Sequence, residues 1–365
     1  MAPLGRISWM GQVDAVLASV SDMLYSWGLM WLLIGAGIFF TVRTRGVQVR
    51  HTDAIAASVI GSRDGSHGGI TSFQAFAVGL ACRVGTGNIV GVALALILGG
   101  PGAVLWMWLV AILGTATAFS EATLAQLFKV RRPDGTFRGG PAYYISRGLG
   151  LPILGGVFAV VFLIANGLVM PMVQANAITA SLQGAGGLSP SLGAVLVVAL
   201  TAPVLLGGLR AMARVAEYLA PFMALAYLVL VLAILLTHPV QALEAVRSII
   251  EGAFGLRQGL GGLAGGVTAA LLNGVRRGLF SNEAGLGGAA CAAGSATVSH
   301  PVQQGFIQAF GVVVDTLFVC TATALAILVA GADVLQPGAS AKESAGTLTQ
   351  DAIAHLVGEW SRWPM

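Results

Sequence analysis

The sequence predicts an all-α membrane protein with several spanning helices. Of its 365 residues, 56% are hydrophobic and 9% are charged, whereas about 25% of the residues in a typical soluble domain are charged. The hydrophobic residues form runs of about 20 or more, the length that a helix needs to cross a bilayer. Two of these runs are interrupted by glycine and polar residues, at 83–91 and at 277–288. Such a pair of interrupted runs is the sequence feature that best indicates the binding site of a secondary transporter.

The first interruption is the segment Arg83-Val-Gly-Thr-Gly-Asn-Ile-Val-Gly91. A glycine in a helix interior costs roughly 1 kcal/mol relative to alanine, and this segment contains three. Irregular backbone is tolerated inside a bilayer only where protein covers it or a cavity meets it. We therefore expect a helix that breaks near the membrane midplane, with its free amides and carbonyls facing a ligand. The segment 277–288 has the same mixture of small and polar residues and should break a second helix.

The other elements follow from the hydrophobic runs in chain order. Residues 1–22 are weakly amphipathic and are expected to lie at the membrane interface, and residues 331–365 are expected to form a polar C-terminal tail. Between them we expect a transmembrane domain, 23–330, with about eight spans. The expected spans are 23–42, 72–98, 103–128, 151–182, 192–209, 215–236, 260–290 and 302–329. The run 151–182 is too long to cross upright and must tilt, and residues 240–258, of mixed charge, are expected to form an interfacial helix.

Lysine and arginine residues set the expected orientation. The loops after the first, third and fifth spans hold four, five and two of them, 11 of the 19, and the loops after the second and fourth spans hold none. The positive-inside rule therefore places these three loops in the cytoplasm and the N-terminus outside, in the cell inner membrane. Because the basic residues lie in short loops, the net charge of +4 indicates orientation and not binding to nucleic acid. No N-terminal run matches a cleavable signal peptide.

Other features have plain structural interpretations. Cys82, Cys291 and Cys320 lie in or beside apolar segments without a pairing pattern, so we expect small buried hydrophobes and not disulfides. The tryptophans at 27, 31, 106 and 108 are expected to anchor helices at the interface. No catalytic residue is expected, because the chain has no histidine pair with metal spacing, no phosphate-binding glycine loop and no nucleophile elbow.

Several motifs together resemble the alanine/glycine:cation symporter family, the sodium:alanine symporters. In chain order these motifs are Ile70–Ala75, Gly85–Gly91, Gly99–Gly102, Glu121–Thr123, Gly139–Tyr144, Val173–Asn176, Arg277–Gly287, His300–Gly305 and Asp315-Thr316. The resemblance covers nearly the whole chain. It implies a leucine-transporter-type fold in which one extra N-terminal helix precedes two inverted repeats of five helices. The first repeat would be 72–236, and the second, 260–330, would be incomplete because this chain ends three spans short of the family pattern.

The resemblance implies symport of a small neutral amino acid, alanine or glycine, with a sodium ion; the residues alone do not distinguish Na⁺ from H⁺. No cofactor is expected. A zwitterion suits two broken helices, because half-helix N-termini attract a carboxylate and half-helix C-termini attract an ammonium group or a cation. The candidate substrate-binding residues are Gly85, Thr86, Gly87, Asn88, Ser281, Asn282, Gly285, Gln174, Asn176 and Gln74. The candidate ion-binding residues are Thr86, Asn88, Asn282 and Glu283.

Alternatives to these assignments stay open. The glycines could serve only close helix packing, Glu283 could pair with Arg276 or Arg277, and Gln74 could bond a neighbouring residue. Gln174 and Asn176 lie two residues apart and so point to different sides of their helix. Arg83, Glu121 and Asp315 are interpreted as structural or gating charges, each expected to have a partner. The alternatives to a symporter are a truncated fragment that does not transport and a channel-like membrane protein.

Overall fold

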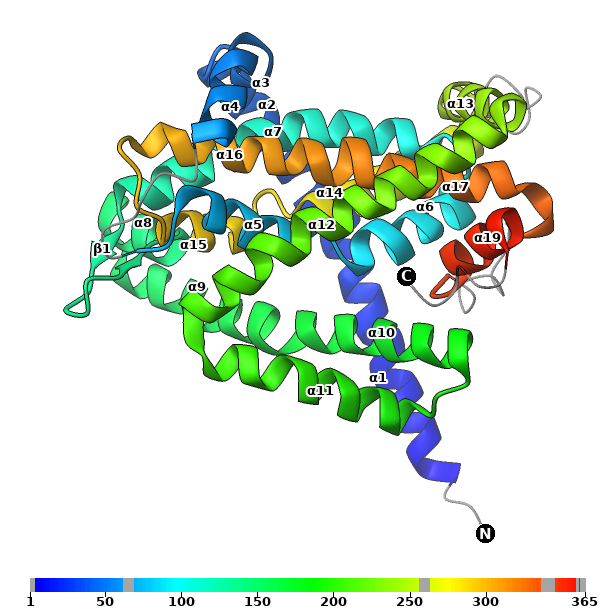
Figure 1. Cartoon of the computed structure of the whole chain (residues 1–365), viewed down its shortest axis with the longest axis horizontal. Helices are drawn as coiled ribbons and strands as arrows, with labels where there is room; N and C mark the ends of the chain where they lie inside the picture. Colours follow the sequence, from blue (N-terminus) through cyan, green and yellow to red (C-terminus); the bar gives the residue numbers. More distant parts are fainter. Residues whose placement is uncertain (1–3, 62–68, 256–262, 336–344, 359–360, 362–365) are drawn as a thin grey trace.

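The computed structural model describes residues 4–61, 69–255, 263–335, 345–358 and 361, and these residues are almost entirely helical (Figure 1). Residue 260, where the second repeat is expected to begin, and Arg63 of the first basic loop lie outside the described residues. The helices of the N-terminal half are α1 (Leu4–Met23), η1 (Leu24–Leu29), α2 (Met30–Arg43), α3 (Val47–Arg50), α4 (Thr52–Ile60), α5 (Ser72–Arg83), η3 (Gly87–Gly91), α6 (Val92–Gly99), α7 (Ala103–Leu127) and α8 (Pro141–Gly148).

The remaining helices complete the bundle. They are α9 (Pro152–Ile164), η4 (Ala165–Val169), α10 (Met170–Gly186), α11 (Pro190–Leu206), α12 (Gly208–Thr237), α13 (Pro239–Ala253), α14 (Leu263–Asn282), α15 (Gly288–Gly294), α16 (Pro301–Val312), η5 (Val313–Cys320), α17 (Thr321–Ala330), η6 (Gly331–Asp333) and α19 (Leu348–Val357). Two short strands, β1 (Val130–Arg131) and β2 (Phe137–Arg138), pair antiparallel in a hairpin. The elements η1, η3, η4 and η5 are π-helical turns.

Membrane-spanning character is clear from helix length and apolar composition. Five helices in the described residues are long and apolar enough to cross a bilayer, and a sixth is obtained if α5 and η3–α6 count as one bent span. The chain is therefore a multi-pass membrane protein. The expected number of about eight spans and the leucine-transporter-type repeat stay predictions.

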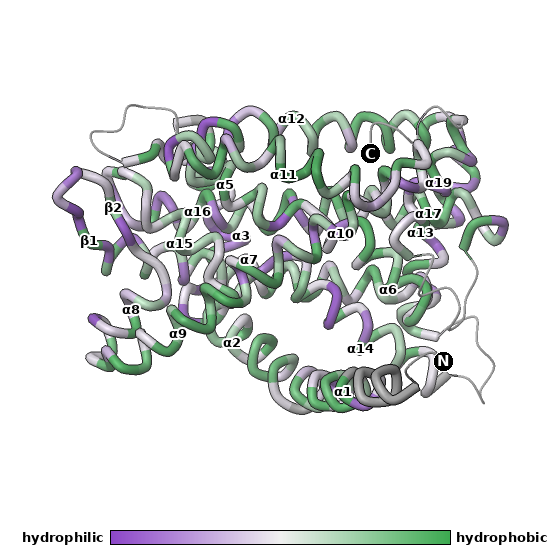
Figure 2. The backbone as a smooth tube through the Cα atoms, turned by 90° about the horizontal axis from the view of Figure 1, so that it is seen from below, coloured by the Kyte–Doolittle hydropathy of each residue, from purple (hydrophilic) through white to green (hydrophobic). Residues whose placement is uncertain are grey.

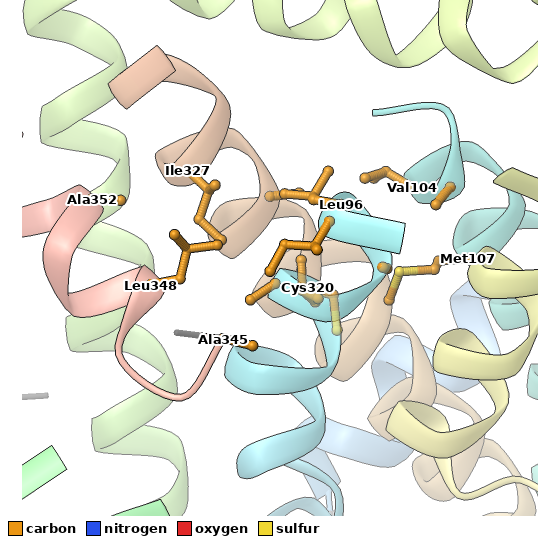
Figure 3. Packing of buried hydrophobic residues seen from close by; sticks show 14 of the residues in the cluster. Leu96, Val104, Met107, Cys320, Ile327, Ala345, Leu348 and Ala352 are labelled. Carbon is orange, nitrogen blue, oxygen red and sulfur yellow. The ribbon is translucent and has the colours of Figure 1, made fainter. Parts of the chain in front are cut away.

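The centre of the bundle consists of α7, α14 and α16 together with the bent pair α5 and α6 (Figure 1). Helix α7 packs closely on α16 and α14 because its buried side is built from small residues, which let helix backbones approach. Beside this centre, α6, α7 and α17 meet in an apolar cluster in which Leu96, Met107 and Ile327 are buried (Figure 3). Removal of a buried leucine or isoleucine side chain from such a cluster costs about 2–5 kcal/mol.

An outer layer surrounds this centre. Only 6% of the apolar stretch of the span formed by α9, η4 and α10, Pro152–Gly186, is buried, compared with 61% of the apolar stretch of Pro301–Asp333. The apolar side chains on α9–α11 therefore face outward, as expected for helices that contact lipid. The consecutive helices α1, η1 and α2 form one long N-terminal helix, and its α1 end extends away from the bundle (Figure 1).

Three segments differ from the simple loops and tail of the sequence-based description. The basic loop after the first span contains α3 and α4, and α4 packs on α16. The basic loop after the third span contains the β1–β2 hairpin, which is hydrophilic and lies at one end of the molecule (Figure 2). The expected polar tail contains α19, which buries Leu348 and Ala352 against α17 (Figure 3). These elements are too short or too weakly patterned to be distinguished from loops by periodicity alone.

Candidate functional site

The first expected break is confirmed. Helix α5 starts with a capping box, in which Thr71 and Gln74 satisfy each other's backbone amides, and it ends at Arg83. Val84 then adopts an extended conformation, and the helix resumes at Gly87 with a bend of 48° between the two halves. Thr86 is therefore the residue that precedes the second half-helix, whose N-terminal end carries a partial positive charge.

The second expected break is also confirmed. Helix α14 ends at Asn282, and α15 starts at Gly288. Between them Glu283, Gly285 and Gly287 have positive φ angles of 51°, 98° and 93°. Glycine adopts this conformation at little cost, whereas for Glu283 it costs roughly 1–2 kcal/mol. Strained non-glycine backbone of this kind is concentrated at functional sites.

The two breaks lie against each other. A Cβ atom added to Gly87 would lie 3.3 Å from the Cα atom of Ser281 and 3.4 Å from the ring of Phe280, so a larger residue would require the two segments to move apart slightly. The Asn88 amide nitrogen Nδ2 is 3.4 Å from the Ser281 hydroxyl. The close-packing interpretation of these glycines therefore holds for Gly87, and the packing brings polar side chains from both breaks together.

Asp315, on the π-helical turn η5, is the centre of this polar contact. Its carboxylate accepts hydrogen bonds from Asn88 Nδ2 (2.6 Å), Ser281 Oγ (2.7 Å) and Thr316 Oγ1 (2.8 Å). Asn88, Asp315 and Thr316 are fully buried, and Ser281 is 1% exposed. The Cys320 sulfur lies 3.3 Å from Asn88 Nδ2 and 3.1 Å from Ser281 Oγ. We call Asn88, Ser281, Asp315 and Thr316 the carboxylate cluster.

Asn88 also holds the backbone of the first break. Its side-chain oxygen Oδ1 accepts a hydrogen bond from the Gly85 amide at 2.9 Å. One amide side chain therefore contacts the irregular backbone with its oxygen and the Asp315 carboxylate with its nitrogen.

Arg83 joins the ends of both helices from the other direction. Its Nε donates to the Asn282 carbonyl at 3.0 Å, and Nη1 donates to Gln308 Oε1 at 3.2 Å. The side chain is 3% exposed, and Asp315 and Glu283 are the strongest of the acidic groups that act on it. The last residue of α5 thus caps the C-terminal end of α14, where carbonyl groups lack helical partners.

A cavity of about 290 Å³ opens beside the first break. Gly85, Thr86 and Gln174 supply polar lining, and Gln174 Oε1 accepts a hydrogen bond from the Thr86 amide at 3.1 Å. The rest of the lining is mostly apolar and comes from η3, α10, α12 and the segment around α19: Val84, Ile89, Val90, Ala177, Ile178, Ser181, Leu182, Ala185, Met223, Gly346 and Gln350. Pockets for drug-sized ligands start at about 300 Å³, so this cavity suits a small molecule.

The candidate residues divide into groups. Gly85, Thr86 and Gln174 line the cavity, whereas Asn88 and Ser281 lie in the carboxylate cluster with Gly87 packed beside them. Asn282 faces α7, because a Cβ atom on Gly114 would lie 3.0 Å from its Nδ2. Gly285 donates its amide hydrogen to Glu121 Oε2 at 3.0 Å, so Glu121 has a backbone partner in place of an ion pair.

Two candidates lie away from the cavity. Gln74 caps α5 at the end opposite the break and donates from Nε2 to Glu217 Oε2 at 2.9 Å. This agrees with the alternative that Gln74 bonds a neighbouring residue and not a ligand. Asn176 is exposed and is not among the cavity residues. Gln174 and Asn176 thus face different sides, as the two-residue spacing predicts.

The proposed pairing of Glu283 with Arg276 is wrong. Arg276 pairs with Asp22 at 2.8 Å and with Ser26. In the described part of the chain, Arg277 Nε and Glu283 Oε2 are both buried without a hydrogen-bond partner. Arg277 and Glu283 therefore do not form an ion pair with each other within 4 Å.

From the sequence, Asp315 is expected to have a structural or gating role, and Thr316, although part of the Asp315-Thr316 motif, is not among the expected site residues. One signal could have identified them, because an ionisable residue inside a span is a functional candidate by default. The π-helical turn that aims both side chains at the breaks has no comparable sequence signature, although such turns are frequent at functional sites.

A polytopic helical protein with two broken helices that meet at buried polar residues has the architecture of a secondary transporter. The family model of the sodium:alanine symporters matches residues 10–365. The chain belongs to the sodium:alanine symporter family. Members of this family are transporters and not enzymes.

Curated relatives agree with this assignment. The chain is 46% identical over 316 residues to YrbD of Bacillus subtilis, described as a candidate sodium/proton-dependent alanine carrier, covering 86% of this chain and 64% of YrbD. It is 41% identical over 350 residues to GlnT of the same organism, a candidate sodium/glutamine symporter, covering 96% and 71%. It is 39% identical over 316 residues to the sodium/alanine symporter AgcS of Methanococcus maripaludis, covering 84% and 69%. The chain thus spans about two thirds of the length of these relatives.

Proposed function

We propose that the protein takes up a small neutral amino acid together with a sodium ion, by alternating access around the two broken helices. The observation that carries the proposal is the position of Asn88, which links the cavity-lining backbone at Gly85 to the buried carboxylate of Asp315. A substrate site and a cation site would share this one side chain. AgcS is named as a sodium/alanine symporter, which supports sodium as the ion and alanine as the first substrate to test.

The cavity supports binding of a small zwitterion. An α-carboxylate at Thr86 would meet the N-terminal end of η3–α6, where amides and the helix dipole favour negative charge. The carboxylate could take the place of Gln174 Oε1 at the Thr86 amide, and the released Gln174 amide group could then bond the substrate. The mostly apolar remainder of the cavity leaves room for a short side chain.

The carboxylate cluster supports binding of the cation. Asp315, Ser281 and Thr316 present oxygen atoms at one buried point, and oxygen is the ligand that hard cations prefer. A buried carboxylate is costly unless charge or hydrogen bonds compensate it. A sodium ion would supply that compensation, and the hydroxyl groups of Ser281 and Thr316 would rotate so that their oxygen atoms, and not their hydrogens, face the ion. This assignment puts Asn88 at the ion site, while Thr86 belongs to the cavity.

The second break supports a role in gating. Its strained backbone is held at Gly285 by Glu121 and at the Asn282 carbonyl by Arg83. Hinge residues are those that absorb changes in φ and ψ when a domain closes. We place the moving part of the transport cycle at 283–287. The distribution of lysine and arginine among the loops supports an orientation in the inner membrane with the N-terminus outside.

Uptake of radiolabelled alanine into proteoliposomes tests this function. The purified chain should accumulate alanine when sodium is higher outside, and the accumulation should collapse when the gradient is removed. An equal rate with and without the gradient would indicate a channel-like protein. No uptake, together with no alanine binding to the purified chain, would indicate a protein that does not transport. Competition by unlabelled glycine and glutamine would identify the preferred side-chain length.

A further inference from the structure

A second cavity, which shares no lining residue with the cavity at the first break, lies at the end of the molecule where the basic loops meet. It has a volume of about 370 Å³. Its charged lining residues are Arg132, Asp134, Arg138 and Arg210. Two of these arginines come from the β1–β2 hairpin and its turn, and the third comes from the start of α12. We call this cavity the arginine pocket.

The hairpin wall of the arginine pocket is fixed by backbone and side-chain hydrogen bonds. The Arg132 amide donates to the Thr136 carbonyl at 2.8 Å, and the Gly135 amide donates to the Arg132 carbonyl at 3.0 Å. Asp134 Oδ1 accepts from the Thr136 amide at 2.9 Å and from its hydroxyl at 2.6 Å. The turn therefore holds Arg132 and Arg138 in place at the mouth of the pocket.

The opposite wall is tied to the hairpin through Lys129. Its Nζ donates to the Ala296 carbonyl at 2.8 Å and lies 4.4 Å from the centre of the Phe137 ring. Partial burial lowers the pKa of Lys129 to about 8. Ile70, which lines the pocket, accepts from the Thr297 amide at 3.0 Å. The pocket walls are thus linked across three separate chain segments, at Ile70, 129–138 and 296–297.

The charge of the lining favours an anion. Hydrogen bonds from Thr136 hold the pKa of Asp134 below its ordinary value, so this group is ionised at neutral pH. Asp134 lies 3.7 Å from Arg132. Among the described residues that line the pocket, three are arginines and one is an aspartate. Guanidinium groups from different segments suit the several oxygens of a phosphate group.

The position of the pocket favours a phospholipid over a free phosphate. Arg210 stands at the first turn of α12, a helix long and apolar enough to span the bilayer, and only 22% of the apolar stretch of this helix is buried. The adjacent residues Leu206 and Leu209 are 88% and 38% exposed, and Leu209 itself lines the pocket. An anion bound here would lie at headgroup depth, with apolar side chains beside it for the acyl chains. Basic pockets between spanning helices on the cytoplasmic side are known to hold anionic headgroups.

We propose that the arginine pocket binds the phosphate headgroup of an anionic phospholipid, through Arg132, Arg138 and Arg210. The bound headgroup would bridge the hairpin that follows α7 and the start of α12. It would therefore stabilise the packing of these two spans. The proposal does not depend on the transported substrate.

Thermal unfolding of the purified full chain in detergent tests the proposal. Dioctanoyl phosphatidylglycerol is titrated as the anionic lipid, dioctanoyl phosphatidylcholine as the zwitterionic lipid, and inorganic phosphate as the free anion. Of these three compounds, we expect only phosphatidylglycerol to raise the melting temperature, and the rise should saturate with lipid concentration. The double variant R138Q/R210Q should bind it about tenfold more weakly or worse, because two charge-assisted contacts are lost. Arg147→Gln, on the exposed last turn of α8, should bind like the unmodified protein.

The lysine variant R138K/R210K tests whether weaker binding by R138Q/R210Q results from a folding defect. It keeps both charges and loses only the planar guanidinium geometry. It should bind phosphatidylglycerol with intermediate affinity. Equal affinity of R138Q/R210Q and the unmodified protein would overturn the proposal, as would equal stabilisation by phosphatidylcholine. A response to inorganic phosphate at the same concentration as to phosphatidylglycerol would identify the ligand as a free anion, and would also overturn it.

Discussion

The amide nitrogen of Asn88 lies 2.6 Å from the carboxylate of Asp315, and both side chains are fully buried. Asn88 belongs to the first broken helix and Asp315 to a continuous span 227 residues later in the chain. The same asparagine accepts a hydrogen bond from the Gly85 amide, which lies at the wall of the cavity. The contact therefore connects the proposed substrate site to the proposed ion site.

Substitution of Asn88 should weaken both proposed sites. Asn88→Ala leaves the Gly85 amide and an Asp315 oxygen without their partner, and each unsatisfied buried group costs about 1–3 kcal/mol. We expect alanine uptake to fall roughly 10- to 100-fold, with the sodium concentration for half-maximal uptake rising as well. Measurement of uptake against sodium concentration in proteoliposomes checks this. Asn176→Ala, at an exposed position on α10, is the matched control and should retain normal uptake.

A larger residue at position 85 should weaken alanine binding through its effect on Gln174. A Cβ atom on Gly85 would lie 2.7 Å from Gln174 Nε2, so Gly85→Ala must displace the Gln174 amide group from the place where we propose that it bonds the substrate. We expect alanine affinity to fall by about tenfold, the effect of one lost hydrogen bond. Calorimetric titration of G85A, Q174A and the double variant distinguishes the cause. Additive losses would show that the two residues act independently, contrary to this account.

Arg83 should be essential for stability. Its guanidinium group is buried between the Asn282 carbonyl and Gln308, with Asp315 and Glu283 as the acidic groups that act on it most strongly. Arg83→Met would leave the Asn282 carbonyl and Gln308 Oε1 without this donor, and each unsatisfied buried group costs about 1–3 kcal/mol. The melting temperature in detergent should fall markedly. Arg147→Met, which removes an exposed arginine, should leave it within error; an equal fall in both variants would contradict a specific role for Arg83.

Glu121 should stabilise the backbone conformation of the second break, 283–287. Glu121→Gln keeps an acceptor for the Gly285 amide, whereas Glu121→Met removes it. Because a hydrogen bond to a charged group contributes about 1.5–3 kcal/mol, we expect faster amide hydrogen exchange across 283–287 in the methionine variant only. Mass spectrometry of the corresponding peptide measures it, with the hairpin peptide 130–138 as the internal control. Faster exchange in the glutamine variant as well would show that the carboxylate charge, and not the acceptor, is required.

The orientation can be tested by labelling introduced thiols. Gln183→Cys lies near the turn between α10 and α11, and Arg147→Cys lies at the end of α8, near the hairpin. In a background without Cys82, Cys291 and Cys320, a membrane-impermeant maleimide should label the thiol introduced at position 183 in intact cells. The thiol at position 147 should react only after permeabilisation. The reverse pattern would place the N-terminus inside.

Composition and glycine content were sufficient to predict the membrane class and both breaks. A run of about 20 apolar residues has few structural interpretations other than a membrane-spanning helix. Gly85, Gly87 and Gly285 interrupt such runs where helical backbone is expected. The periodicity of side chains also separated Gln174 from Asn176. These predictions need only local sequence.

The contacts between the breaks could not be predicted, because they depend on packing between distant segments. Asp315 reaches Asn88 and Ser281 only because η5 winds as a π-helical turn and Gly87 lets η3 approach α14. Gln74 looked like a pocket residue in sequence, yet its side chain completes a capping box at the other end of α5. The helices α3, α4 and α19 and the β1–β2 hairpin are short, and tertiary contacts decide their structure.

The most direct test is the sodium dependence of alanine binding to the purified chain and to Asp315→Ala, measured by calorimetric titration with and without sodium chloride, with choline chloride as the ionic-strength control. We predict that sodium increases the alanine affinity of the unmodified chain by at least about tenfold, a coupling free energy of about 1.4 kcal/mol. In Asp315→Ala, alanine should bind with the same low affinity in both salts. Retention of the full sodium effect in Asp315→Ala would contradict the assignment of the ion site to the carboxylate cluster.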